Sequence, residues 1–350
     1  MSGTQEYCCT IYLKSLETLI KCFLKFRFVF IPLLLGGCDP ESKPERINSS
    51  PIAKFNISTD LPEIGIPITF DGSSSSDSEG YVTEYQWIFE NEDSQMGVSI
   101  KHIFTKTGRQ TVSLVVTDDG GLSDTSSQDL FLSLAILAEY PLSITSPSGL
   151  SLSYDKQSLW TVSDKPGGGV YNIDFEGHLI KSLDYSGADL EGVASATDGG
   201  SLWIVEEFLG TIIQIDTAGI VLRSVELSGV RDGGGLEGVT VNPNNGDILL
   251  LKEKDPGIFL RLNDQLEVLL YKQIAFANDF SGMDYDASQD ILWIISDQDK
   301  ILIKYKIGDG VIDEYPFRIN KAEGLAVFPD KNILFIVSDD AKRLYRLTLP

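Results

Sequence analysis

The sequence has very few of the residue types on which most catalytic and transition-metal centres depend. All four cysteines lie at or before position 38, and the chain contains two histidines, His102 and His178. Beyond Cys38 the chain therefore cannot form a disulfide, use a thiol nucleophile or bind zinc through several His or Cys ligands. Any metal site there would use oxygen ligands, which favours calcium or magnesium.

Basic residues are also scarce. The chain has 28 Lys and Arg against 51 Asp and Glu, which gives a net charge of −23. Such a surface repels nucleic acid and attracts cations and basic partners, so we expect no nucleic-acid partner. The alternative is that the negative charge serves solubility alone.

The sequence lacks an apolar run long enough to span a bilayer, but its N-terminus has the pattern of a targeting segment. Lys21, Lys25 and Arg27 precede the apolar residues 28–35, and Gly36-Gly37-Cys38 follows. This pattern resembles a bacterial lipobox and predicts a lipoprotein signal peptide over 1–37, lipidation at Cys38 and attachment to the membrane through the lipid. The alternative is an ordinary signal peptide with a chance cysteine.

Residues 38–50 are polar and contain prolines, which predicts a lipidated tether. We accordingly expect an envelope protein that is lipid-anchored and extracytoplasmic, facing the periplasm or exposed at the cell surface.

Residues 51–133 alternate short apolar segments with turn clusters, as is typical of a β-sandwich. The stretches Phe70–Gly80, Tyr85–Trp87 and His102–Asp118 resemble those of a polycystic kidney disease (PKD) domain. The resemblance implies an immunoglobulin-like spacer or adhesion module with no catalytic role.

A glycine followed by an apolar strand recurs five times in residues 136–350, at intervals of 42 to 46 residues. These glycines are Gly149, Gly192, Gly238, Gly282 and Gly324. After each glycine, further short strands follow, and four short strands in a repeat of this length indicate a propeller blade. The predicted fold class is therefore all-β: a five-bladed β-propeller at 136–350, preceded by an immunoglobulin-like (PKD) β-sandwich.

The last repeat contains only three strands before Pro350. Residues 136–142 match the pattern of residues 311–317, including a shared Glu-Tyr-Pro, so we expect residues 136–144 to complete the last blade and close the ring. Closure removes exposed sheet edges, which would otherwise favour aggregation.

Four of the repeats share short motifs around the glycine, at 189–193, 236–239, 280–283 and 322–325. These motifs, and the Trp-Ile-Val type strands that follow, resemble the SdiA-regulated family. The resemblance implies a five-bladed, calcium-binding propeller that is distantly similar to NHL-repeat proteins. It implies no biochemical activity.

Two sets of polar residues keep a constant distance from the repeat glycines. The residues directly before the glycines are Ser148, Glu191, Glu237, Ser281 and Glu323. The residues fifteen positions after them are all acidic: Asp164, Glu207, Glu253, Asp297 and Asp339. The first strand of a blade runs away from one mouth of the tunnel and the second returns, so both sets are predicted at the same mouth.

Crowded carboxylates raise one another's pKa values unless a cation compensates their charge. A hard divalent ion with six to eight oxygen ligands would do so, and we predict one Ca²⁺ held by the three glutamates of the first set with the serines, water or carbonyls. For the second set, capping of turns by hydrogen bonds to backbone N–H groups is an equal alternative.

Two functions fit these expectations. The first is a calcium-stabilised, monomeric surface propeller that binds a protein or a glycan. The second is a calcium-dependent hydrolase of an ester, lactone or phosphoester, in which a carboxylate of the outer set acts as base. Neither set contains a histidine and no nucleophile motif is present. Whether the chain is an enzyme therefore stays open, and no catalytic residue is assigned.

Overall fold

The structure is a computed structural model that describes residues 47–90 and 94–350. The predicted signal peptide, Cys38 and most of the predicted tether lie outside the described residues. Within them the chain is all-β, as predicted, with one short 3-10 helix, η1 (Pro329–Lys331). No helix in these ranges has the length and hydrophobicity of a membrane span.

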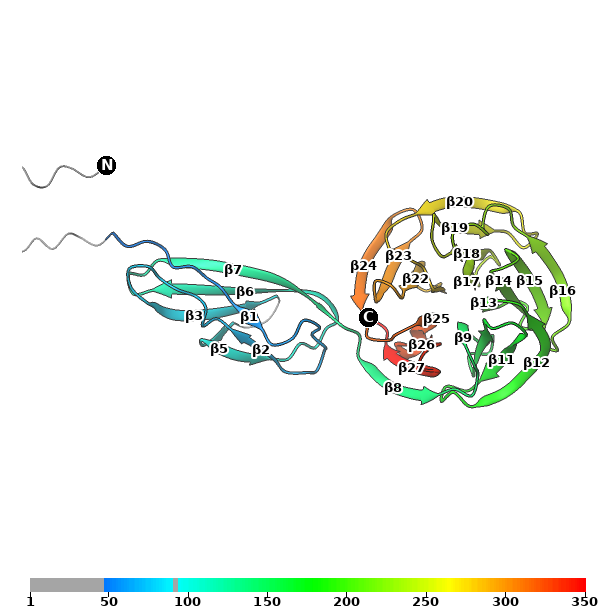
Figure 1. The fold of residues 1–350 in the computed structure, drawn as a ribbon, viewed down its shortest axis with the longest axis horizontal. Coiled ribbons are helices and arrows are strands. Elements are labelled where there is room, and N and C mark those ends of the chain that lie inside the picture. The colour runs from blue at the N-terminus through cyan, green and yellow to red at the C-terminus, as the bar shows by residue number, and fades with distance from the viewer. Residues whose placement is uncertain (1–46, 91–93) are drawn as a thin grey trace, which may run out of the picture. The chain divides into compact units, whose positions relative to one another are not determined.

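The N-terminal part of the described chain forms a two-sheet sandwich (Figure 1). One sheet contains β1 (Asn56–Ile57), β2 (Ile68–Asp71) and β5 (Ser99–His102). The other has the order β4 (Gln95–Met96), β3 (Val82–Phe89), β6 (Gly108–Asp118) and β7 (Ser123–Leu132). All neighbouring strands in both sheets are antiparallel.

Aromatic side chains fill the space between the two sheets. Trp87 is fully buried, with ring centroids 5.2 Å from Phe55 and 5.7 Å from Phe70. Its indole N–H donates to the carbonyl of Gly97 over 2.8 Å, which satisfies the only polar atom of the side chain. The sandwich is therefore held by its own core.

The C-terminal part forms five four-stranded antiparallel sheets arranged as the blades of a propeller (Figure 1). Blade 1 contains β9 (Pro147–Leu152), β10 (Leu159–Ser163), β11 (Gly168–Ile173) and β12 (Leu179–Gly187). Blade 2 contains β13 (Leu190–Ser195), β14 (Ser201–Glu206), β15 (Thr211–Asp216) and β16 (Val221–Glu226). Blade 3 contains β17 (Leu236–Val241), β18 (Ile248–Lys252), β19 (Gly257–Leu262) and β20 (Val268–Ile274).

Blade 4 contains β21 (Gly282–Asp286), β22 (Ile291–Ser296), β23 (Ile301–Lys306) and β24 (Gly310–Pro316). Blade 5 contains β25 (Ala322–Phe328), β26 (Ile333–Ser338), β27 (Arg343–Thr348) and β8 (Ile136–Pro141). The pairing of β8 with β27 is antiparallel and sets Tyr140 opposite Leu344. The chain thus closes the ring with its first propeller strand, as the shared Glu-Tyr-Pro pattern predicts.

The first strand of each repeat is the innermost of its blade, and these strands contact one another in a closed ring in the order β9, β13, β17, β21, β25. Between the blades the packing is apolar. Trp160 belongs to the same core cluster as Val193 of the next blade, and Trp203 likewise shares a core cluster with Val239. The blades are therefore joined by hydrophobic contacts, which positions the ends of the inner strands rigidly around the axis.

Candidate metal centre

The glutamates before the repeat glycines are placed by β-bulges. In blade 2, Leu190 pairs with Glu206 and Gly192 pairs with Val205, so Glu191 is the extra, unpaired residue. The same register shift leaves Glu237 and Glu323 unpaired in blades 3 and 5. A bulge redirects a side chain at the end of a strand. The three bulges therefore account for three glutamates leaving the ladder at the same level of the tunnel.

The glycines themselves are required because the inner strands approach one another closely. A Cβ on Gly149 would lie 2.3 Å from the carbonyl oxygen of Glu191, and one on Gly324 would lie 2.6 Å from the backbone nitrogen of Leu150. At the level of the glycines the tunnel narrows to a void of about 10 Å³, which is room for about one water molecule. This constriction is the floor of the acidic mouth.

Above it lies a cavity of about 300 Å³ with an almost wholly polar lining. It is lined by eight carboxylates from both predicted sets and the region around them, with one serine, one glutamine and two lysines. These residues are Asp164, Glu191, Glu207, Glu237, Glu253, Asp279, Asp297, Glu323, Ser281, Gln298, Lys254 and Lys321. Both predicted sets thus meet at one mouth, although Ser148 and Asp339 are not in the lining.

A repeated backbone hydrogen bond fixes the second set. The N–H of Asp164 donates to the carbonyl of Ser146, and that of Glu207 donates to the carbonyl of Asp189, over 3.1 and 3.0 Å. Blades 3 and 5 repeat this bond. In blade 4 the N–H of Asp297 donates instead to the hydroxyl of Ser281, over 3.2 Å. Four blades therefore hold this position in the same way.

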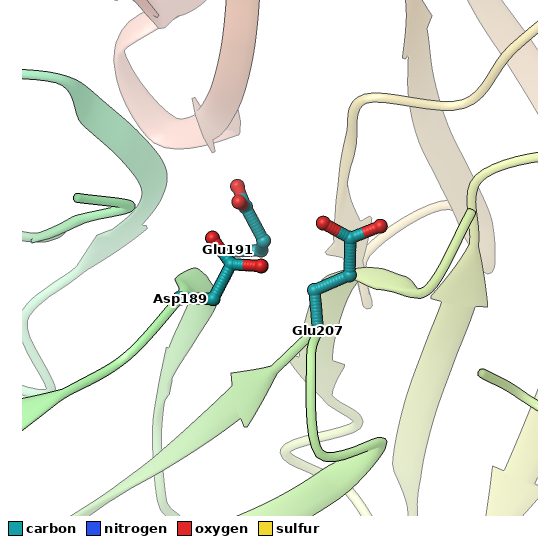
Figure 2. A group of neighbouring side chains, drawn as sticks. All are labelled: Asp189, Glu191 and Glu207. Carbon is teal, nitrogen blue, oxygen red and sulfur yellow. The ribbon is translucent and has the colours of Figure 1, made fainter. Parts of the chain in front are cut away.

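Two groups of carboxylates come close enough to share a cation. Asp189, Glu191 and Glu207 form one group and Glu207, Glu237 and Glu253 form the other. In each group one carboxylate oxygen from every residue lies within 4.8 Å of those of the other two. Figure 2 shows the carboxyl groups of the first group converging. Each group mixes the two predicted sets and shares Glu207, whereas Glu323 belongs to neither.

Hydrogen bonds separate the carboxylates that are held by the protein from those that are not. Ser148 donates to Glu191 Oε2 over 2.7 Å, which assigns this serine to positioning. The backbone N–H of Gly235 donates to Glu207 Oε1 over 2.7 Å, and that of Ala322 donates to Asp297 Oδ1 over 2.9 Å. Capping therefore operates at two of the five outer positions, and at Glu207 it coexists with a place in both carboxylate groups.

Glu237 differs from its neighbours. Its residue is 8% exposed and lines the cavity, yet its carboxylate receives no hydrogen bond from any other residue in the described ranges. Burial, and then the charges of Glu191 and Glu207, raise its pKa well above the usual range of a glutamate. A buried carboxylate without a partner is costly, so this position is suited to a ligand that brings positive charge.

Four further carboxyl groups at this mouth, Asp164, Asp189, Glu191 and Glu323, also have raised pKa values. Burial raises the pKa of Asp189 to about 6, helped by the neighbouring charge of Glu207. Burial likewise raises the pKa of Glu323 to about 7, although Lys321, 3.6 Å away, acts in the opposite direction. Burial raises the pKa of Glu191 well above its usual range and, together with Asp339, raises that of Asp164. At these positions burial therefore disfavours the charged form of the carboxyl group.

Some cavity residues were missed by the sequence reasoning. Asp279 and Lys321 of the cavity lining, and Asp189 of a close carboxylate group, lie three positions before a repeat glycine. Lys254 and Gln298 lie sixteen positions after one. These two offsets repeat as regularly as the predicted ones. They give no common residue type, because one offset supplies acids in two blades and a lysine in another. The constant distance from the glycine was the available signal for these residues, but the residue type at that distance varied from blade to blade.

Comparison with known families agrees with this architecture. The family model described as SdiA-regulated matches residues 138–348, which is more than half of the chain. The chain belongs to the SdiA-regulated family. The model of the PKD domain matches residues 48–131, ahead of it, so this member of the family carries an N-terminal PKD domain.

Two curated relatives each match a segment of 89 residues of this chain. The pre-pro-metalloprotease PrtV of Vibrio cholerae is 34% identical over 89 residues, 25% of this chain and 9% of that protein. The collagenase ColA of Clostridium perfringens is 28% identical over 89 residues, 25% of this chain and 8% of that protein. The chain thus spans less than a tenth of the length of these relatives.

Two solved structures similar to this chain are the following. The PKD1 domain of the Vibrio cholerae metalloprotease PrtV is 31% identical, covers 24% of this chain and 98% of that domain, and has a TM-score of 0.22. A chain of the nidogen/laminin complex covers 76% of this chain and 89% of its own, with 11% identity and a TM-score of 0.43.

Proposed function

We propose that this member of the SdiA-regulated family is an extracytoplasmic β-propeller that binds calcium at its acidic mouth and presents a binding surface for a protein or a glycan. The observation that carries the calcium proposal is Glu237, a buried carboxylate that lies among close carboxylates and accepts no hydrogen bond from the residues that the structure describes. The PKD domain and the family support an extracytoplasmic module. The PKD domain serves as a spacer.

The donor set fits calcium. Carboxylate and hydroxyl oxygens line the cavity, and no histidine or cysteine does. Calcium accepts six to eight oxygen ligands in flexible geometry, which suits carboxylates from several blades. Glu207 and Glu237 are the residues we expect to bind the ion, because Glu207 belongs to both close groups. Charge neutralisation would remove the repulsion between neighbouring carboxylates, which adds to the effect of burial on their pKa values.

We further propose attachment of the protein to a membrane through a lipid on Cys38. Lys21, Lys25 and Arg27, the apolar run and the glycines before Cys38 support this step. Two acyl chains give stable attachment, whereas one is marginal. Residues 38–50 would then separate the PKD domain from the bilayer.

Calorimetric titration of calcium into chelator-treated protein tests the proposal. The wild type should bind calcium, and Glu237→Gln should weaken binding at least tenfold, because it removes a charge and keeps the size. Glu176→Gln, at an exposed turn outside the cavity, is the matched control and should bind as the wild type does. Wild-type affinity in Glu237→Gln would refute the site, and absence of binding to the wild type would refute the ion.

A calcium-dependent hydrolase is the second candidate. Lys254 and Lys321 line the same cavity, where they could bind the negative charge of a phosphoester or carboxylate substrate. Glu323, with a pKa of about 7, is suited to proton transfer near neutral pH. A bound calcium ion would supply a Lewis acid. Panels of esters, lactones and phosphoesters, with and without chelator, separate the two functions: chelator-sensitive turnover that Glu323→Gln abolishes would establish the enzyme.

A further inference from the structure

A second cavity, of about 540 Å³, lies at the opposite ends of the innermost strands. Its lining comes from the residues that follow the repeat glycines, where β9, β13, β17, β21 and β25 end. The glycine constriction of about 10 Å³ separates it from the acidic mouth. The volume falls within the range of small-molecule sites. A ligand here would bind independently of any ion on the other side.

The walls of this cavity are mixed. Hydroxyl groups come from the serines and threonines of several blades, and Leu152 and Val241 add apolar surface. Tyr154 lines the cavity with 63% of its surface exposed, which places an aromatic ring where a ligand can reach it. Such a lining suits a small organic molecule better than a metal ion.

Asp284 gives the cavity its distinctive charge. The corresponding position, two residues after the repeat glycine, is Ser151, Ala194, Thr240 and Ala326 in the other blades, so this carboxylate is the single charge of its ring. Its Oδ1 accepts hydrogen bonds from the hydroxyl of Thr240 over 2.9 Å and from the N–H of Tyr285 over 2.8 Å. Its Oδ2 accepts one, from the N–H of Val327 over 2.8 Å.

The charge of Asp284 is not compensated by the protein. In the described part of the chain it forms no ion pair, and the one lysine of the cavity, Lys156, lies 2.7 Å from Asp330 and pairs with it. Burial raises the pKa of Asp284 to about 6, while its three hydrogen bonds act to lower it. Oδ2 accepts a single protein hydrogen bond, so it retains capacity for a second donor.

We propose that this cavity binds a small organic ligand with a primary ammonium group, which donates to Asp284 Oδ2. A neutral ligand would leave the carboxylate buried without a counter-charge, which is costly. An ammonium ion supplies both the charge and the hydrogen bond, and such charge-assisted bonds are the strong ones. A calcium ion is disfavoured because Asp284 is one carboxylate, and Asp286 bonds to Ser288 and Gln289.

Saturation-transfer NMR with glucosamine and glucose tests the proposal, since the two sugars differ by an ammonium group in place of one hydroxyl. Glucosamine should bind the full chain at least tenfold more tightly than glucose, a difference expected for a hydrogen-bonded charge. Propylammonium is the probe without hydroxyl groups and should also bind. Equal affinity for the two sugars, or no binding of either ammonium compound, would overturn the proposal.

Asp284→Asn should weaken glucosamine binding at least tenfold. Because Asp284 also joins three strands, this variant could fail to fold, and Thr197→Trp provides a second test. Thr197 is exposed and lines the cavity, so the larger side chain obstructs it without removing a hydrogen bond of Asp284. Unchanged glucosamine affinity in Thr197→Trp would overturn the proposal even if Asp284→Asn were unfolded.

The same probe shows whether the ammonium site is distinct from the acidic cavity. Glu237→Gln lies on the other side of the constriction and should bind glucosamine as the wild type does, with or without chelator. Loss of glucosamine binding in this variant would place the ammonium ligand in the acidic cavity and would overturn the assignment to Asp284.

Discussion

Replacement of Glu323 by Gln should stabilise the calcium-free protein at alkaline pH. Glu323 is half-buried among carboxylates, and the loss of hydration raises its pKa to about 7, from 4.5 for an unperturbed glutamate. Above pH 7 the folded protein must carry this charge in an unfavourable place, whereas the unfolded chain exposes it to water. Gln keeps the shape of the side chain and removes the charge, so the penalty disappears.

The magnitude follows from the two pKa values. A folded-state pKa above the unfolded one means that the folded protein binds the proton more tightly, so the wild type loses stability as pH rises from about 4.5 to about 7. At about 1.4 kcal/mol per pKa unit, the loss at pH 8 is about 3 kcal/mol. Loss of the ion pair with Lys321 offsets up to about 1 kcal/mol, which leaves a gain of about 2 kcal/mol.

Urea unfolding in the presence of a chelator, at pH 4 and pH 8, measures this difference. Tryptophan fluorescence reports mainly on the propeller, which contains three of the four tryptophans. The unfolding free energy of Glu323→Gln should exceed that of the wild type at pH 8 and equal it at pH 4. The unfolding free energy of Glu176→Gln should equal that of the wild type at both pH values. Equal unfolding free energies for Glu323→Gln and the wild type at pH 8 would refute the argument from crowded carboxylates.

Three further outcomes are expected. Deletion of 136–144 should lower the melting temperature of the propeller far more than deletion of 51–130, because β8 completes blade 5; equivalent melts would argue against closure by this strand. Phe335→Ala, at a fully buried site, should cost about 3–5 kcal/mol in urea unfolding, whereas Phe208→Ala, 73% exposed, should change stability by about 0.5 kcal/mol at most. Cys38→Ser should move the protein from the membrane to the soluble fraction, and a membrane-bound variant would contradict lipidation.

The architecture could be predicted because its signals repeat. The glycine spacing gave the number of blades, and the Glu-Tyr-Pro pattern identified the strand that closes the ring. Both signals are local in sequence and are repeated where the fold repeats. The fold followed from them before any side-chain geometry was known.

The sequence could predict which residues surround the acidic mouth as two rings, but not which of their carboxylates lie close together. A constant offset from the glycines placed both rings on one side of the propeller, but which carboxylates approach one another depends on bulges and side-chain directions. Glu191 and Glu237 leave the ladder through bulges, whereas Ser281 in blade 4 does not. The close groups therefore mix the rings and include Asp189, which has an acidic counterpart at the same offset in only one other blade, Asp279.

The second cavity gave no signal in the sequence. Asp284 is the only charged residue at its offset, and the other blades have serine, threonine or alanine there. A charged residue that occurs in one blade alone does not form a repeating pattern, so the periodicity of the sequence could not reveal it. Its importance depends on its partial burial and on having no ion pair with any described residue, which are properties of the folded state.

The location of a bound ion tests the central claim most directly. Crystals grown with excess calcium, measured at long wavelength, should show an anomalous peak in the acidic cavity within about 2.3–2.6 Å of oxygens of Glu207 and Glu237. A peak confined to the Asp71–Asp77 loop of the PKD domain, or an acidic cavity without a peak at saturating calcium, would contradict the account.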